Sequence, residues 1–261
     1  MKNIRIIFYN FKISMLNQMA HKVNFILRVL SDSIYFVVYY IFYTVIFSYV
    51  SNINGWSKYE VLLLMGSFHI VVSLFAGIYI PNLAQIPDLV KSGQLDGYIL
   101  KPVNCQLLTS TRSIDGGSLA NIALGVGIII NSALKLNLHF QITQILMFVF
   151  FLLTGSFIMY CVLFILLSTV FWLQDSSWSI GFFMTFNNFA DKPVTIYKGV
   201  VYRFLVFIFP IGLVANVPAS IWLNNGDFNL HVWFLISAVI LFSLSKLVWS
   251  RGLKIYEGAS I

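Results

Sequence analysis

The stretch Ile142–Leu173, ITQILMFVFFLLTGSFIMYCVLFILLSTVFWL, runs for 32 residues without one charged side chain. A helix of about 20 apolar residues rises about 30 Å, which is the thickness of the hydrocarbon core of a bilayer. The stretch therefore predicts a membrane-spanning helix. Because it is longer than one perpendicular crossing needs, the helix must tilt or project beyond the membrane.

Five further apolar stretches, each of 17 to 20 residues, flank this one. They predict an all-α, polytopic membrane protein with one transmembrane domain over residues 1–261, because only helices satisfy every backbone group inside lipid without a closed barrel. The expected spans, in chain order, are residues 33–50, 61–80, 116–134, 142–173, 204–223 and 232–248.

The composition supports a membrane protein. Hydrophobic residues make up 59% of the chain and charged residues 10%, against about 25% charged in an ordinary soluble domain. Such a chain has too little polar surface for a soluble enzyme and too few charges for a disordered chain or a coiled coil. The two cysteines, Cys105 and Cys161, form neither a disulfide framework nor a metal-binding pattern. The net charge of +7 favours contact with lipid headgroups over nucleic acid.

The distribution of Lys and Arg predicts the orientation. Residues 1–32 carry five, and residues 81–115, residues 174–203 and the C-terminal segment carry three each, whereas the other loops carry only Lys58 and Lys135. Cytoplasmic loops are the ones enriched in Lys and Arg. Both termini are therefore expected in the cytoplasm, and residues 174–203 are expected to form a cytoplasmic loop.

Two segments are amphipathic enough to lie in the headgroup layer. Residues 1–22 predict an interfacial helix whose apolar stripe bears Ile4, Phe8, Phe11 and Met15. Residues 178–189 carry aromatic side chains at helical spacing and could lie flat on the cytoplasmic face or dip into the bilayer. Pro193 is expected to end that second helix, because proline disfavours helix at the residue before it.

The motifs that would indicate catalysis are missing. The sequence contains no HExxH, no GxSxG and no Gly-Lys dipeptide for a phosphate-binding loop, so we expect no enzyme activity and no catalytic, metal or cofactor residues in this chain. The nine acidic residues lie at the ends of the expected spans or in loops. In the cores of the spans His69 is the lone ionisable candidate, because Lys246 lies near the end of the sixth span, and we expect His69 to bond to a neighbouring helix rather than to carry protons.

Small residues recur along the third span. Gly116 and Ala120, followed by Ala123 and Gly127, stand at the small-xxx-small spacing that lets helices approach closely. The pattern fits packing within one chain, and it also fits an interface between subunits.

The segment that joins the second and third spans is the most informative loop, residues 81–102, PNLAQIPDLVKSGQLDGYILKP. Pro87 suits the first turn of a helix, Asp88 suits the positive end of its dipole, and Gly93 suits its C-terminal stop. The loop therefore predicts a short cytoplasmic helix over residues 87–92, which could fit a groove in another protein.

Here the chain resembles the permease subunits of type-2 ABC transporters. Those proteins carry a Lys/Arg-x-Gly-x-Leu-Asp/Glu stretch and a following Pro after the second span, which correspond to Lys91–Asp96 and Pro102. The run LKPVN at residues 100–104 and the tail GLKIYEGAS at residues 252–260 are similar to the six-span subgroup of daunorubicin-resistance and viologen-exporter permeases. Lys192 and Gly258 depart from the pattern of that subgroup.

The resemblance implies a partner that hydrolyses ATP. In such transporters two cytoplasmic ATPase subunits bind ATP and Mg, and two permeases, either copies or paralogues, pair in the membrane. It implies export of an amphipathic or hydrophobic substrate, such as a drug, a peptide or a lipid-like molecule, across the bacterial cytoplasmic membrane. The alternative from the residues alone is a secondary transporter or a channel that works without a partner. The resemblance assigns no substrate-binding residues, and it implies that these residues couple the permease to the ATPase: Pro87, Asp88, Leu89, Lys91, Gly93, Leu95 and Asp96.

Overall fold

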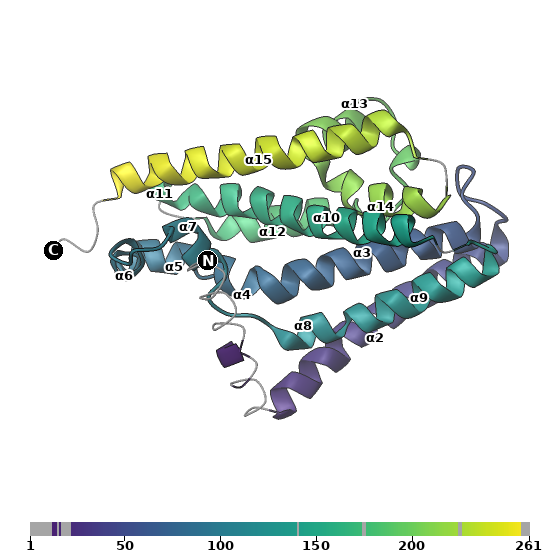
Figure 1. The fold of residues 1–261 in the computed structure, drawn as a ribbon, viewed down its shortest axis with the longest axis horizontal. Coiled ribbons are helices and arrows are strands. Elements are labelled where there is room, and N and C mark those ends of the chain that lie inside the picture. Colours follow the sequence, from purple (N-terminus) through teal and green to yellow (C-terminus); the bar gives the residue numbers. More distant parts are fainter. Residues whose placement is uncertain are drawn as a thin grey trace.

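The computed structural model describes residues 12–14, 16, 22–139, 141–173, 176–223 and 226–256. Within these ranges every regular element is a helix, apart from one isolated β-bridge between Ile53 and Trp56. The all-α prediction is therefore confirmed. Five long helices run lengthwise through the molecule (Figure 1). They are α2 (Lys22–Tyr49), α3 (Lys58–Ile78), α9 (Ile122–Lys135), α10 (Ile142–Ser168) and α15 (Phe228–Ile255).

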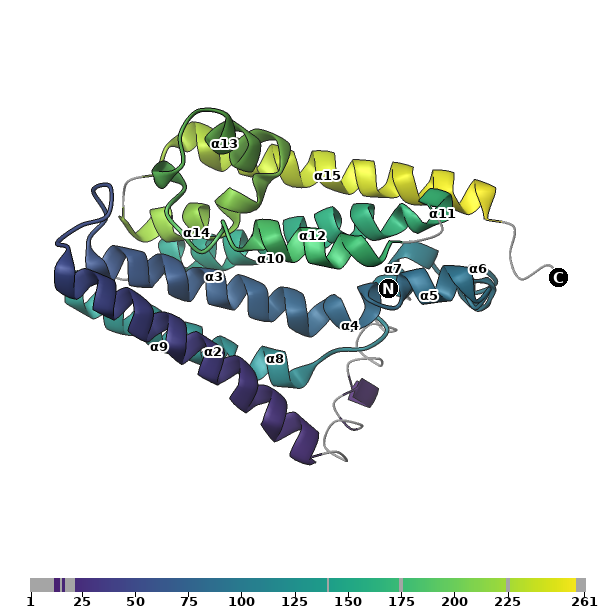
Figure 2. The ribbon, with the colours of Figure 1, turned by 180° about the vertical axis from the view of Figure 1, so that it is seen from behind.

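Short helices occupy the two ends of this bundle. One end, called here the α5 end, holds α4 (Ile80–Leu83), α5 (Ile86–Lys91), α6 (Asp96–Ile99) and α7 (Cys105–Ser110) (Figure 2). The opposite end, called the α13 end, holds α13 (Gly199–Arg203) and the loop from residue 50 to residue 57. The other short elements are α8 (Gly116–Ala120), α11 (Val170–Leu173), α12 (Ser177–Asn187), η1 (Val194–Ile196), η2 (Phe204–Ile208), η3 (Pro210–Gly212) and α14 (Leu213–Leu223).

Five of the six expected spans correspond to helices long and apolar enough to cross a membrane. The first begins much earlier than hydropathy suggests, because α2 starts at Lys22 and includes Arg28 and Asp32. The fourth continues past α10 into α11, which contacts α5. It thus extends into the layer of short helices, as its length of 32 residues requires.

The core lies where α10 packs against α3, α14 and α15. Its largest fully buried side chains include Phe164 on α10, Phe75 on α3 and Phe234 on α15. Burying an aromatic or aliphatic side chain of this size is worth about 1.5–3 kcal/mol in water. Inside a bilayer the comparable gain comes from close packing rather than from water exclusion.

A close contact between α3 and α9 uses glycines other than the predicted ones. A Cβ atom on Gly125 of α9 would lie 2.9 Å from the carbonyl oxygen of Gly66 on α3, so the two backbones touch. Ala120, Ala123 and Gly127 instead face outward from α8 and α9. Packing within the chain therefore depends on Gly125, which lies two positions from both Ala123 and Gly127 of the small-residue pattern read from the sequence.

The expected fifth span, residues 204–223, is not one straight helix. The segment Gly199–Ile208 and the segment Pro210–Leu223 meet at an angle of 84°. Both ends of this bent pair lie at the α13 end: Thr195, just before it, bonds to Trp56, and Leu223 lines the same small pocket as Trp56. The segment is therefore a re-entrant hairpin rather than a crossing helix, which corrects the sequence-based prediction.

The fifth crossing is supplied by the segment before the hairpin. The Ser179 hydroxyl donates to the carbonyl of Leu166 near the α5 end, and Phe183 packs on Phe75. The chain then continues through residues 188–196 to Thr195 at the α13 end. Residues 178–189 thus neither lie flat on a surface nor form part of a cytoplasmic loop, because α12 runs along α10 toward the other end. The helix α12 ends at Asn187, six residues before Pro193, so the expectation that this proline ends the helix is not confirmed.

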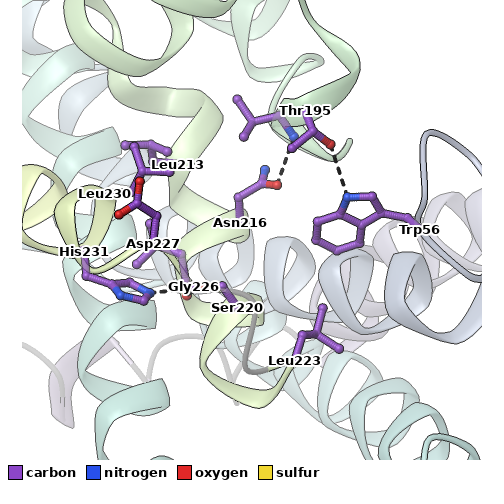
Figure 3. A pocket seen from close by; sticks show the side chains of 12 residues that line it. Trp56, Thr195, Leu213, Asn216, Ser220, Leu223, Gly226, Asp227, Leu230 and His231 are labelled. Atoms are coloured by element: carbon purple, nitrogen blue, oxygen red, sulfur yellow. Dashed lines mark hydrogen bonds between the residues drawn. The ribbon is translucent and has the colours of Figure 1, made fainter.

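Polar contacts fix the hairpin to its neighbours (Figure 3). The indole N–H of Trp56 donates to the Thr195 hydroxyl at 3.2 Å. The side chain of Asn216 accepts from the backbone N–H of Val194 at 2.9 Å and donates to the carbonyls of Lys192 and Gly212. These bonds satisfy backbone groups that lie outside any regular helix, as buried non-helical backbone requires.

The corrected path places Lys198 and Ser92 at opposite ends of the molecule, and this placement gives the first testable prediction. We expect Ser92→Cys to react with a membrane-impermeant maleimide only in inverted vesicles, and Lys198→Cys only in intact cells. Background labelling should be low because Cys161 is fully buried and burial raises the pKa of the Cys105 thiol to about 11. Labelling of both positions from the same side would contradict the re-entrant hairpin.

Candidate functional site

The predicted short helix is present as α5, Ile86–Lys91. Pro87 occupies its first turn together with Asp88, and Gly93 follows it with φ of +71°, a left-handed conformation that glycine adopts without strain. The backbone N–H of Leu95 returns to the carbonyl of Leu89 at 3.0 Å, which closes the turn after the helix. The sequence-based boundaries are therefore correct to within one residue.

The seven predicted coupling residues divide between two faces. Leu89 and Leu95 are buried in the hydrophobic core, together with Ile86, and fix α5 against α10 and α11. Pro87, Gly93 and Asp96 are half-buried, whereas Asp88 and Lys91 are exposed. Leu95 is fully buried, so it packs inside the permease and offers no surface for contact with a partner.

The exposed surface beside α5 includes an apolar residue. The side chain of Leu100 is 84% exposed, just after α6. The neighbouring Ile99 is 43% exposed, and Lys101 and Pro102 are exposed as well. Together Asp88, Lys91, Ile99, Leu100 and Lys101 form what we call the α5 surface, in which charged and apolar side chains are mixed.

The segment that carries the α5 surface has its two ends held together by hydrogen bonds, at the point where it leaves the bundle. The Asn82 side-chain oxygen accepts from the backbone N–H of Ser113 at 2.8 Å, and its amide donates to the Ser113 carbonyl at 2.7 Å. The backbone N–H of Asp115 donates to the Gly77 carbonyl at 2.7 Å. The end of α3 and the start of α8 are thus held together, so the α5 surface cannot shift without moving both helices.

The four residues predicted for an interfacial helix, Ile4, Phe8, Phe11 and Met15, lie outside the described residues. Of the same segment, residues 12–14 are helical. The hydroxyl of Ser14 is buried and accepts from the backbone N–H of Ile114 at 3.2 Å. This bond connects the N-terminal segment to the connection that leads into α8.

A groove of about 410 Å³ lies between α2, α3 and α12. Its volume is in the range of small-molecule sites. Aromatic and aliphatic side chains form most of its wall, with polar groups at intervals. The lining residues that the argument below uses are Arg28, Asp32, Tyr35, Phe36, Tyr39, Phe68, His69 and Asp191.

Charged groups lie along the groove although hydropathy placed them outside the spans. Arg28 pairs with Asp115 of the α8 connection at 2.5 Å, and Asp32 accepts a hydrogen bond from the Asn121 amide at 3.3 Å. Asp191 pairs with Lys192 at 2.6 Å. Asp32 is thus inside α2 rather than at the end of a span, which corrects the expectation that all acidic residues lie at span ends or in loops.

His69 faces this groove from the middle of α3. Its ring stacks on Phe36, with ring centroids 3.7 Å apart. Its Nε2 atom is buried and has no hydrogen-bond partner among the described residues. Such an atom can accept or donate one hydrogen bond to a molecule in the groove, so His69 is a candidate contact for a bound substrate.

Sequence reasoning singled out His69 but missed the groove around it. The signal that could have indicated it is the pair Arg28 and Asp32, one helical turn apart just before the first apolar run. Charged residues at that spacing lie on one helix face, and they remain inside a membrane helix when they are paired. Their partners, Asp115 and Asn121, are more than 80 residues away in the chain, so the pairing could not be read from the sequence.

Comparison with protein families identifies the architecture. The family model described as "ABC-2 family transporter protein" matches residues 33–260, which is most of the chain. The chain belongs to the ABC-2 transporter family. No curated protein matches it significantly.

Family membership confirms the predicted resemblance and establishes a multi-pass membrane permease of an ABC transporter. Members of the ABC-2 family are transmembrane components and are not themselves catalytic. The α5 surface and the groove are then the two parts of this ABC-2 permease that need a function.

Proposed function

We propose that this chain is the membrane subunit of an ATP-driven exporter in the bacterial cytoplasmic membrane. The α5 surface docks on a cytoplasmic ATPase subunit, which binds ATP and Mg. Two such subunits work with two permeases, the second being a copy or a paralogue of this chain. Both termini and the α5 end face the cytoplasm.

The observation that carries the proposal is how the α5 surface is built. A segment that transmits motion from a partner must expose side chains that contact the partner, and it must be anchored in the core of its own protein. Asp88 and Leu100 are exposed, whereas Leu89 and Leu95 anchor the segment in the core. The bonds between Asn82 and Ser113 connect it to both α3 and α8. Motion of α5 therefore reaches α3, which lines the groove.

The substrate class follows from the groove. Its aromatic wall favours an apolar or aromatic molecule, and Asp32, His69 and Asp191 favour one that also carries polar groups. An amphipathic or hydrophobic drug, peptide or lipid-like molecule fits this combination. We therefore assign the groove as part of the path of such a molecule toward the outer face.

The proposal is tested by isolating the permease with its partners. We expect the chain, tagged and kept at its native level, to copurify with a soluble protein that bears a phosphate-binding loop. ATP hydrolysis by the complex in proteoliposomes should rise when an amphipathic substrate is added. A Phe36→Ala variant should raise the substrate concentration needed for half stimulation about tenfold, as expected for the loss of one buried aromatic contact. Purification without any ATPase would contradict the proposal.

A further inference from the structure

A second cavity, of about 500 Å³, lies on another part of the molecule, between α7, α10, α15 and the end of α3. None of its lining residues also lines the groove. Its wall is apolar at Phe157 and Phe242 and polar at Asn104, Gln106 and Thr111. It also contains one cation, Lys246, and no carboxylate among its lining residues.

Lys246 points into the cavity. Its ammonium group lies 4.3 Å from the centre of the Phe242 ring, one helical turn back toward the start of α15. Side chains of a helix tilt toward its N-terminus, which is here toward the interior of the bilayer rather than toward the nearby end. No carboxylate among the described residues forms an ion pair with this group. A cation in this position can pair with an anion from outside the described part of the chain.

Lys246 lies in the part of α15 nearer to the α5 end (Figure 1). It stands nine residues before the end of α15 at Ile255, which corresponds to about 14 Å along the axis. The whole helix, at 28 residues, is about 42 Å long, so it exceeds a hydrocarbon core of about 30 Å. Because the ammonium is directed toward Phe242, one turn nearer the interior of the bilayer, an anionic group must enter the cavity to reach it.

The floor of the cavity is rigid and offers hydrogen-bond donors. The Gln106 amide donates to Tyr160 at 3.2 Å and to Ser245 at 3.1 Å, so it joins α7 to α10 and α15. The Asn104 side-chain oxygen accepts from the Leu107 N–H at 3.0 Å. This leaves the amide N–H groups of Asn104 as donors on the same wall as Lys246.

We propose that this cavity binds an anionic phospholipid. The phosphate group pairs with Lys246 and accepts from Asn104, and the acyl chains lie along Phe157 and Phe242. Basic cavities between membrane helices on the cytoplasmic side are suited to anionic headgroups. The proposal rests on the proposed orientation, with the α5 end in the cytoplasm, but not on ATP-driven export, so lipid binding can fail or succeed independently of the exporter function.

The test measures lipid binding to the purified full-length chain in detergent by native mass spectrometry. The probes are dioleoyl-phosphatidylglycerol and dioleoyl-phosphatidylcholine, which share their acyl chains. One lysine near the surface is worth about 1 kcal/mol toward an anionic lipid, so we expect about fivefold tighter binding of phosphatidylglycerol. Lys246→Gln should abolish this preference, and Lys246→Arg should keep it. The matched control is Lys254→Gln, an exposed lysine of the same helix that does not line the cavity, and it should leave the preference unchanged.

Three results would overturn the proposal. Equal binding of the two lipids would show that the cavity does not select an anionic headgroup. An equal loss in the Lys246→Gln and Lys254→Gln variants would indicate general surface charge. Competition by millimolar inorganic phosphate would assign the cavity to a soluble anion instead.

A second measurement needs no variant and so does not depend on folding of Lys246→Gln. Photoactivatable phosphatidylglycerol should crosslink the wild-type chain at peptides that contain Phe157 or Phe242. Crosslinks found only elsewhere would also contradict the proposal.

Discussion

Replacing Leu100 by Asp is expected to lower stimulation of the partner ATPase by tenfold or more while the permease stays folded. The Leu100 side chain is 84% exposed, so the substitution removes no packing within the chain. Burying a leucine against a partner is worth about 1.5–3 kcal/mol, and 1.4 kcal/mol corresponds to a factor of ten in affinity. The added carboxylate would then be buried without a partner, which adds to the loss.

The measurement is the rate of ATP hydrolysis as the permease is titrated into the ATPase. The matched control is Phe228→Asp, which changes a side chain that is 75% exposed at the α13 end. We expect this control to keep full stimulation. Leu95→Asp is unsuitable as a test because Leu95 is fully buried, so its loss of stimulation would report unfolding. Full stimulation by the Leu100→Asp variant would show that the α5 surface does not contact the ATPase.

Replacing Gly125 by Leu is expected to cost about 3 kcal/mol of stability or to prevent folding. The new Cβ atom would lie 2.9 Å from the Gly66 carbonyl oxygen and 2.6 Å from Ile70 on α3. The Gly66 oxygen belongs to a helix backbone that cannot shift alone, so α3 and α9 would have to separate. Overpacking of this kind costs about 1–3 kcal/mol, and more when the backbone must move.

Gly127→Leu is the matched control, because a Cβ atom on Gly127 meets nothing within 4 Å. The two variants add the same side chain to the same helix two residues apart. We expect the thermal midpoint in detergent and the folded yield to fall for Gly125→Leu and to stay near wild type for Gly127→Leu. Equal behaviour of the two variants would contradict the close contact of α3 and α9.

Local signals in the sequence predicted the helices that local chemistry determines. The helix α5 depends on Pro87, Asp88 and Gly93, which act within one or two turns, so its boundaries could be predicted to within one residue. The long spans depend on summed hydropathy, and five of them are confirmed as long apolar helices. The start of α2 was missed because Arg28 and Asp32 lower its hydropathy, and only the fold shows that they have partners.

The exchange of the fifth span for a hairpin has a different cause. Residues 204–223 are as apolar as a span because most of them, from Pro210 onward, are buried inside protein, and hydropathy does not separate burial in protein from burial in lipid. The true crossing begins with α12, which has only 11 helical residues and continues without regular helix. Its polar backbone is satisfied by Asn216, a contact between distant residues that no local pattern reveals.

The groove was beyond prediction for a related reason. Its walls come mainly from three helices, and most of the side chains that they contribute are apolar or aromatic ones that are ordinary for a membrane helix. His69 was noticed because an ionisable group inside a span is rare. Its stacking on Phe36, however, depends on how α2 crosses α3.

The re-entrant hairpin also constrains how the chain matures. A membrane insertion machinery releases long apolar helices into lipid one by one, but α14 has 11 residues, which is too short to span. Its bend at Phe209 and Pro210 leaves backbone groups that lipid cannot satisfy. The hairpin can therefore reach its final position only after α10 and α15 have packed against each other. The C-terminal helix must then be synthesised before the α13 end of the bundle is complete.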